Sequence, residues 1–333
     1  MNYQNIRLDK SLYKSNGGFS AQLELLDPTS NYENTELAGL DAFQRQLKRF
    51  DIKVSGKNSD VIGKFFQTSD SAALFPEYVS RAVAQGAREE SLLEEIIASK
   101  TEIQSLDYRS ITTKLDDDLT DTIGEGELIP ETKILLNEHL IRLVKRGRIL
   151  STSYEAIRFQ RSDVVTVALG QIGAHIAKAR MRDAANILIG GNGSIPAAEV
   201  ITTSNNGVLH YNDLLRLWIN FADFDMNVML ASPDMMMKIL SLQELKNPIG
   251  GLNFQNTGAV VTPMGAKLLK SAAVPEKTLI ALDKRFALEM VTSGGVQVEY
   301  DKLIDTQLER ATVTSIYGFS KIFPDAVKVL KIA

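Results

Sequence analysis

The fold is decided by residues 162–191, which read SDVVTVALGQIGAHIAKARMRDAANILIGG. Apolar side chains recur in this stretch mostly every three or four residues, which is the spacing of one face of an α-helix. The positions on this face are Val165, Leu169, Ile172, Ile176, Met181, Ala184 and Leu188. The pattern therefore predicts one long helix over residues 162–189. Gly190-Gly191 predicts its end, because glycine readily adopts the left-handed conformation that follows many helices.

Shorter elements follow this helix. The apolar pattern predicts helices over 211–224 and 233–240, and buried strands over 228–231 and 278–282. We expect these elements to form a compact α/β unit over residues 194–300. Residues 311–332 are rich in β-branched and aromatic side chains, which favours strands that return to the long helix.

The segments before the long helix look less able to fold alone. Residues 1–33 are polar and predict an extended arm, residues 34–49 predict a helix, and residues 77–99 predict another. Strands over 105–113 and 133–149 flank an acidic turn at 115–130, which predicts a long hairpin. A hairpin with few neighbours is marginally stable. We therefore expect the arm and the hairpin to lie on another surface, such as a second subunit.

Composition excludes several classes of protein. The chain has 333 residues, 44% hydrophobic residues, no cysteine and a formal net charge of −4. The absence of cysteine removes disulfides, thiolate catalysis and cysteine-bound metals. A dedicated nucleic-acid binder normally carries a basic excess, and no run of about 18 uncharged apolar residues predicts a membrane span. We expect a soluble protein without membrane partners.

The candidates for catalysis or metal binding are weak. Three histidines, His139, His175 and His210, are isolated from one another in the sequence. The glycines at 190–193 follow a helix, whereas a phosphate-binding loop follows a strand and begins a helix. The acidic stretch comprises Asp116, Asp117, Asp118, Asp121, Glu125 and Glu127. Its spacing does not match a calcium loop, so we interpret it as a solvated hairpin tip.

The densest basic cluster lies on the returning side of the hairpin. It comprises Arg142, Lys145, Arg146 and Arg148. One interpretation places it at the base of the hairpin, facing water or a partner's carboxylates. The other pairs it with an acidic tip such as Asp116–Asp118 on a neighbouring copy, because clusters of both signs suit reciprocal contacts. Nucleic-acid binding is a third interpretation, but no aromatic side chains are interleaved for base stacking.

Several short motifs occur in a collinear order within residues 35–332. They are Phe65-Phe66-Gln67-Thr68-Ser69-Asp70, Leu74-Phe75-Pro76-Glu77, Ile129-Pro130-Glu131, Lys145-Arg146-Gly147-Arg148, Ser153-Tyr154-Glu155-Ala156, Val274-Pro275, Leu279-Ile280-Ala281-Leu282-Asp283, Gly318-Phe319-Ser320-Lys321 and Pro324-Asp325-Ala326-Val327. Together with the order of the elements, they resemble the Hong Kong 97-type major capsid protein family of tailed phages.

The resemblance implies an α+β subunit of the Hong Kong 97-like capsid fold. Such a subunit has an N-terminal arm, an extended β-hairpin loop, a peripheral domain with a long spine helix, and an axial α/β domain. It would divide this chain into the arm (1–64), the first part of the peripheral domain (65–102), the extended loop (103–152), the spine-helix part (153–193), the axial domain (194–300) and the C-terminal peripheral strands (301–333).

The resemblance also implies a function. The chain would be a structural major capsid protein without enzymatic activity, cofactor or metal. It would self-assemble as pentamers and hexamers into an icosahedral head that encloses double-stranded DNA. We expect it in the virion after assembly in the host bacterial cytoplasm, with a portal as partner. Because the arm is short compared with that of the founding member, we also expect a separate scaffolding protein.

One departure concerns covalent cross-linking. The founding member of the family joins its subunits by an isopeptide bond between a loop lysine and an asparagine on the late strands. Lys114 and Lys133 lie in the loop here, but no asparagine follows Asn256. The matching strand positions are about Gln307 and Thr314. We therefore expect no self-cross-linking.

Two alternatives remain open at this point. An encapsulin-like nanocompartment would share the fold but hold enzyme cargo. A small-molecule enzyme would use the unit at 194–300 and would need a pocket with convergent polar groups, for which the sequence offers no set of residues.

Overall fold

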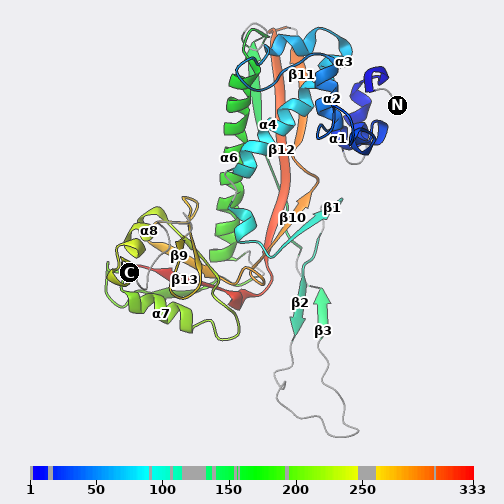
Figure 1. The fold of residues 1–333 in the computed structure, drawn as a ribbon. Helices are drawn as coiled ribbons and strands as arrows, with labels where there is room; N and C mark the ends of the chain where they lie inside the picture. The colour runs from blue at the N-terminus through cyan, green and yellow to red at the C-terminus, as the bar shows by residue number, and fades with distance from the viewer. Residues whose placement is uncertain are drawn as a thin grey trace, which may run out of the picture. The chain divides into compact units, whose positions relative to one another are not determined.

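The computed structural model describes residues 3–13, 18–89, 92–105, 108–114, 133–136, 140–153, 156, 158–191, 195–246, 260–303 and 305–333 (Figure 1). The chain forms two compact units. Unit 1 comprises Met1–Glu90, Lys145–Ala177 and Gly295–Ser315, and unit 2 comprises Ser91–Val144, Lys178–Gly294 and Ile316–Ala333. Helix α6 (Ser162–Gly190) and strand β12 (Leu308–Lys321) each contribute residues to both units.

Helix α6 confirms the prediction made from residues 162–191. It begins at Ser162 and ends at Gly190, and Gly191 follows with φ +68°. The predicted apolar face is packed: Leu169 and Ile176 are buried in the core of unit 1, and Met181, Ala184 and Leu188 in a core of unit 2.

Unit 1 begins with short helices, of which the first four lie where we predicted an extended arm over residues 1–33, and the last lies within the helix predicted over 34–49. They are η1 (Tyr3–Asn5), η2 (Lys10–Tyr13), α1 (Gly18–Leu26), η3 (Thr29–Tyr32) and α2 (Ala42–Arg49). Phe19, Leu23, Phe43 and Leu47 are buried in the core of unit 1, which explains why this polar segment folds. Helix α2 starts later than the predicted residue 34, because Asp41 and Gln44 form a capping box there.

The rest of unit 1 surrounds an aromatic cluster. Its elements are η4 (Ile62–Phe66), α3 (Ser69–Ala72), α4 (Phe75–Glu89), β4 (Val144–Ser153), β11 (Gln297–Leu303) and the first part of β12. The rings of Phe65, Phe75 and Tyr78 lie 5.3–6.1 Å apart, centroid to centroid. The predicted helix over 77–99 ends early, at Glu89, since the chain then enters η5 (Leu93–Glu95) and β1 (Ser99–Ile103) of unit 2.

Helices α4 and α6 approach each other at glycines within unit 1. A Cβ atom at Gly173 would collide with the Val83 carbonyl oxygen and lie 2.7 Å from the Ala87 nitrogen. A Cβ atom at Gly86 would collide with the backbone of Gly170. The two backbones are therefore in direct contact, which only residues without a side chain permit.

Unit 2 contains a six-stranded mixed sheet in the order β5-β13-β9-β6-β8-β7. The strands are β5 (Glu199–Thr202), β6 (Val228–Ala231), β7 (Val260–Val261), β8 (Lys267–Lys270), β9 (Thr278–Leu282) and β13 (Val327–Lys331). Strands β6 and β9 match their predicted ranges. Every residue of both is buried, because the sheet is covered on both faces.

Two cores lie on the two faces of this sheet. Leu214 of α7 (Tyr211–Ile219) and Met235 of α8 (Pro233–Leu240) pack with Met229 and Leu279 on one face. The second half of α6 packs with alternate strand residues such as Leu230 and Ile280 on the other. Helix α8 matches its predicted range, and α7 ends before the predicted residue 224. The short helices α9 (Gln243–Lys246) and η6 (Pro324–Ala326) complete the unit.

The predicted hairpin is present but its returning strand is divided. Strand β2 (Ile111–Lys114) pairs antiparallel with β3 (Lys133–Leu136). The later part of the return is β4, which pairs with β12 instead of with β2. Strand β12 also pairs with β11 and with β10 (Leu288–Ser293), and β1 pairs with β10.

The glycine contact predicts opposite effects for two neighbouring substitutions. Gly173→Ala should destabilise the protein by about 1–3 kcal/mol, because the new methyl group forces α4 and α6 apart. Gly170→Ala is the matched control: its Cβ would meet nothing within 4 Å, so it should stabilise the helix by about 0.5–1 kcal/mol. Urea denaturation of the two variants measures both effects, and changes of the same sign would contradict the contact.

Candidate functional site

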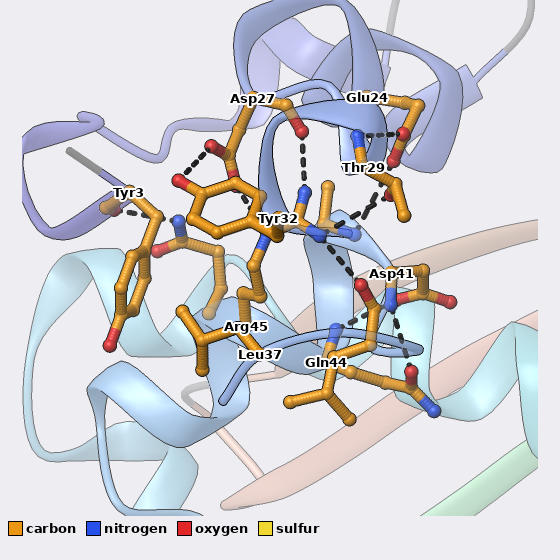
Figure 2. Close-up of polar contacts among 12 residues, drawn as sticks. Tyr3, Glu24, Asp27, Thr29, Tyr32, Leu37, Asp41, Gln44 and Arg45 are labelled. Carbon is orange, nitrogen blue, oxygen red and sulfur yellow. Dashed lines mark hydrogen bonds and ion pairs between the residues drawn. The ribbon is translucent and has the colours of Figure 1, made fainter. Parts of the chain in front are cut away.

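A buried polar cluster fixes the N-terminal helices of unit 1 (Figure 2). Arg45 on α2 is fully buried, and its Nε donates to Asp27 Oδ2 over 2.6 Å. Its other nitrogens donate to the carbonyl oxygens of Asp27, at 2.5 Å, and Leu40, at 2.6 Å. The Tyr32 ring lies 4.4 Å from the guanidinium, and its hydroxyl donates to Asp27 Oδ1 over 2.6 Å. These hydrogen bonds compensate for the loss of water around the buried ion pair, which would otherwise destabilise the folded state.

A second polar cluster joins these helices to α4. Arg81 forms ion pairs with Asp41, at 2.6 Å, and Glu77, at 2.9 Å, and donates to the Ser20 hydroxyl over 2.6 Å. Its guanidinium also lies 4.4 Å from the Phe43 ring. Burial lowers the pKa of Arg81, but the bonds to the two carboxylates outweigh it and leave the pKa raised. The N-terminal helices thus fold onto their own subunit, unlike the extended arm that the sequence predicted.

The predicted basic cluster lies along the start of β4. Arg142, Lys145, Arg146 and Arg148 are all exposed, Arg142 in unit 2 and the other three in unit 1. Arg148 contacts His175 Nε2 of α6 at 2.7 Å. The guanidinium donates this bond, since it has no acceptor.

The glycine inside this cluster has a structural role that the sequence did not reveal. A Cβ atom at Gly147 would lie 2.6 Å from the Val313 carbonyl oxygen and 2.7 Å from Thr314 Cγ2 of β12. Gly147 therefore lets β4 lie close against β12, the strand with which it pairs.

The acidic candidates Asp116, Asp117 and Asp118 lie outside the described residues, as do the other acidic residues of the hairpin tip and His139. The pairing of basic with acidic candidates therefore stays a prediction. His210 precedes α7, and its Nε2 lies 3.0 Å from the Asn205 amide nitrogen. Within the described part of the chain, no group of three or more acidic or histidine side chains is arranged to hold a metal ion. None of the described helices is long and apolar enough to cross a membrane.

Exposed apolar side chains are a further feature of both units. Phe159, Val164 and Val167 are 78%, 56% and 65% exposed in unit 1, and Trp218 and Ile219 are 47% and 69% exposed in unit 2. Val164 and Val167 lie three residues apart on α6, and Trp218 and Ile219 are consecutive on α7; neighbouring exposed apolar residues of this kind are typical of contact surfaces. We did not predict these side chains as a surface from the sequence, although two signals were present: the two valines lie off the apolar face of α6, and Trp218-Ile219 ends a helix that buries Leu217.

A comparison with protein families shows which family the chain belongs to. A family model described as phage capsid protein matches residues 137–331, which is more than half of the chain. The chain therefore belongs to the phage capsid protein family, and it is a structural capsid protein. The comparison with curated proteins finds no match.

Solved structures share the fold. The capsid of cyanophage P-SCSP1u has a TM-score of 0.54 and 15% identity, covering 73% of this chain and 88% of its own. A structure from Gordonia phage Cozz has a TM-score of 0.53 and 14% identity, covering 92% and 98%. An encapsulin complex from Synechococcus elongatus has a TM-score of 0.50 and 14% identity, covering 74% and 89%. The predicted α+β, Hong Kong 97-like capsid fold is confirmed.

The buried ion pair predicts a large effect of one substitution. Arg45→Met should destabilise the protein by about 3–5 kcal/mol, because it leaves the Asp27 carboxylate buried without its cation. Thermal unfolding followed by circular dichroism measures the loss. The double variant Arg45→Met with Asp27→Leu should recover much of this stability, since no unpaired charge remains. If the two variants are equally unstable, packing and not charge pairing holds this segment.

Proposed function

We propose that the chain is the major shell subunit of a tailed-phage head, which closes as pentamers and hexamers into an icosahedral shell around double-stranded DNA. Assembly would take place in the host bacterial cytoplasm, with a separate scaffolding protein and a portal, and the subunit would have no enzymatic activity. The observation that carries the proposal is the family match across α6, the six-stranded sheet and the C-terminal strands. The exposed apolar side chains on both units, such as Val164 and Trp218, support the proposal, because they suit contacts with further copies of the chain.

We further propose that the basic residues at 142–148 form contacts between subunits. Arg142, Lys145, Arg146 and Arg148 on one copy would face Asp116, Asp117 and Asp118 on the hairpin of the next. Such a contact is heterologous, since it joins two different surfaces, and it forms closed rings when the rotation between copies closes. The division into arm, peripheral, loop and axial segments that the family resemblance implied belongs to the same proposal.

A second candidate function has one specific observation in its favour. The encapsulin from Synechococcus elongatus shares the fold at similar coverage. In that case the chain would form a nanocompartment around protein cargo. Particles purified from the source organism and treated with nuclease separate the two functions: protected double-stranded DNA supports the phage head, and an enzyme inside particles without nucleic acid supports the nanocompartment.

Charge reversal tests the proposed contact. The double variant R142E/K145E should lower the yield of assembled particles at least tenfold while leaving the unfolding temperature of the subunit within about 2 °C, because both side chains are exposed. The control K57E/K270E makes the same change of net charge at two other exposed lysines. Restoring assembly with D116K/D117K in the same chain would identify the acidic partner. Normal assembly of R142E/K145E would exclude this basic surface as a contact between subunits.

Assembly itself is tested with the purified wild-type chain. Size-exclusion chromatography and negative-stain microscopy should show rings or closed shells whose proportion rises with protein concentration. A single monomer peak at every concentration, with and without the scaffolding protein, would contradict the proposal. Boiled and reduced particles should give one band near 36.7 kDa on a denaturing gel, since no self-cross-linking is expected. A covalent ladder would contradict that part of the proposal.

A further inference from the structure

The hairpin β2–β3 begins beside a buried carboxylate of unit 2. Glu289 on β10 is only 5% exposed. Its Oε1 accepts hydrogen bonds from the hydroxyls of Thr101 and Tyr108, both at 2.8 Å, and its Oε2 accepts one from Ser110 at 2.6 Å. A buried carboxylate is tolerated when donors replace the lost water, and three hydroxyls do so here.

These donors come from both sides of the point where the hairpin begins. Thr101 lies on β1, which is paired with β10, whereas Tyr108 and Ser110 immediately precede β2 at Ile111. Ser110 is 2% exposed. The carboxylate therefore ties the first strand of the hairpin to the sheet that carries it. Burial and the bond to Glu289 raise the pKa of Tyr108, which agrees with a hydroxyl held as a donor.

The segment that returns from the hairpin, at residues 141–142 between β3 and β4, is held beside the entering segment. The Ile141 nitrogen donates to the Tyr108 carbonyl oxygen over 2.8 Å, so the entering and returning segments are bonded to each other at the base of the hairpin. A Cβ atom at Gly318 of β12 would lie 2.9 Å from the Arg142 carbonyl oxygen and 3.0 Å from Ile141 Cγ2. The returning segment at 141–142 thus lies directly against β12 at a residue without a side chain.

Glu289 and Gly318 lie on the same face of the sheet. Strands β10 and β12 pair Glu289 with Ser320 and Val291 with Gly318. Residues two apart on a strand share a face, so the carboxylate and the glycine hold, on one face of the sheet, the segments that lead into and out of the hairpin, 108–110 and 141–142. The opposite face carries Met290 and Phe319, which pack in the core of unit 2.

We propose that Glu289 is the positioning residue of the hairpin: with Gly318 it sets the direction in which β2–β3 leaves the free subunit, so that the hairpin is oriented before it meets a second copy of this chain. The inference rests on the proposed function only for the identity of that partner. A segment oriented in advance loses less conformational entropy on binding. Glu289 would therefore act on assembly without touching the neighbouring subunit.

Paired spin labels test the orientation directly in unassembled subunits. The chain has no cysteine, so T113C on β2 and T202C on β5 give one defined label pair within unit 2. We expect a narrow distance distribution in the otherwise wild-type chain. E289L should widen it at least twofold and lower particle yield at least tenfold. E289Q should leave both unchanged, because its amide keeps one acceptor and can donate to the Ser110 hydroxyl.

A second variant covers the case in which E289L does not fold. Y108F/S110A keeps Glu289 but removes two of its three donors, and should widen the distribution to an intermediate extent. The control Y211F/S293A removes the same two hydroxyl types elsewhere in unit 2 and should change nothing. A distribution as narrow as the wild type's in a folded E289L or Y108F/S110A subunit would overturn the inference. This readout needs no assembly, so it separates failure of the inference from failure of the proposed function.

Discussion

The register of β12 is the constraint on which most of the other elements depend. This strand of 14 residues pairs with β4, β10 and β11. Its odd-numbered residues Ala311 and Val313 are buried in the core of unit 1, and Tyr317 and Phe319 in a core of unit 2. A slip of one residue would turn all of these side chains to the opposite face. The alternation along one strand therefore has to satisfy two cores at once.

Backbone contact is the second means by which the elements are held. Gly147 and Gly318 allow β4 and the base of the hairpin to rest against β12, and Gly173 allows α6 to touch α4. At each position a methyl group would meet a backbone carbonyl oxygen at 2.9 Å or less. Buried polar groups complete the attachment of the two peripheral segments: Arg45 for the N-terminal helices and Glu289 for the hairpin.

The sequence predicted those elements whose apolar pattern is strong and local. The predicted bounds were nearly correct for helices α6 and α8 and for strands β6 and β9. Burial on one face of a helix, or on both faces of a strand, requires apolar residues at regular positions in the sequence. The short helices within residues 1–33 were not predicted, since this segment is polar and is held by contacts with residues distant in the chain, such as Asp27 with Arg45 and Ser20 with Arg81. The exposure of the basic cluster was predictable from its charge. The hydrogen bonds to Glu289 were not predictable, because their donors lie 179–188 residues away along the chain.

The position of the single tryptophan has a spectroscopic consequence. Trp218 is about half exposed at the end of α7, next to the exposed Ile219. Indole emission moves to shorter wavelength when water is excluded from the ring. All tryptophan fluorescence of the chain therefore reports on this one surface of unit 2. Without any label, a blue shift during assembly would mean that a neighbouring copy covers the end of α7, and a constant spectrum would mean that the α7 end stays in solvent in the finished particle.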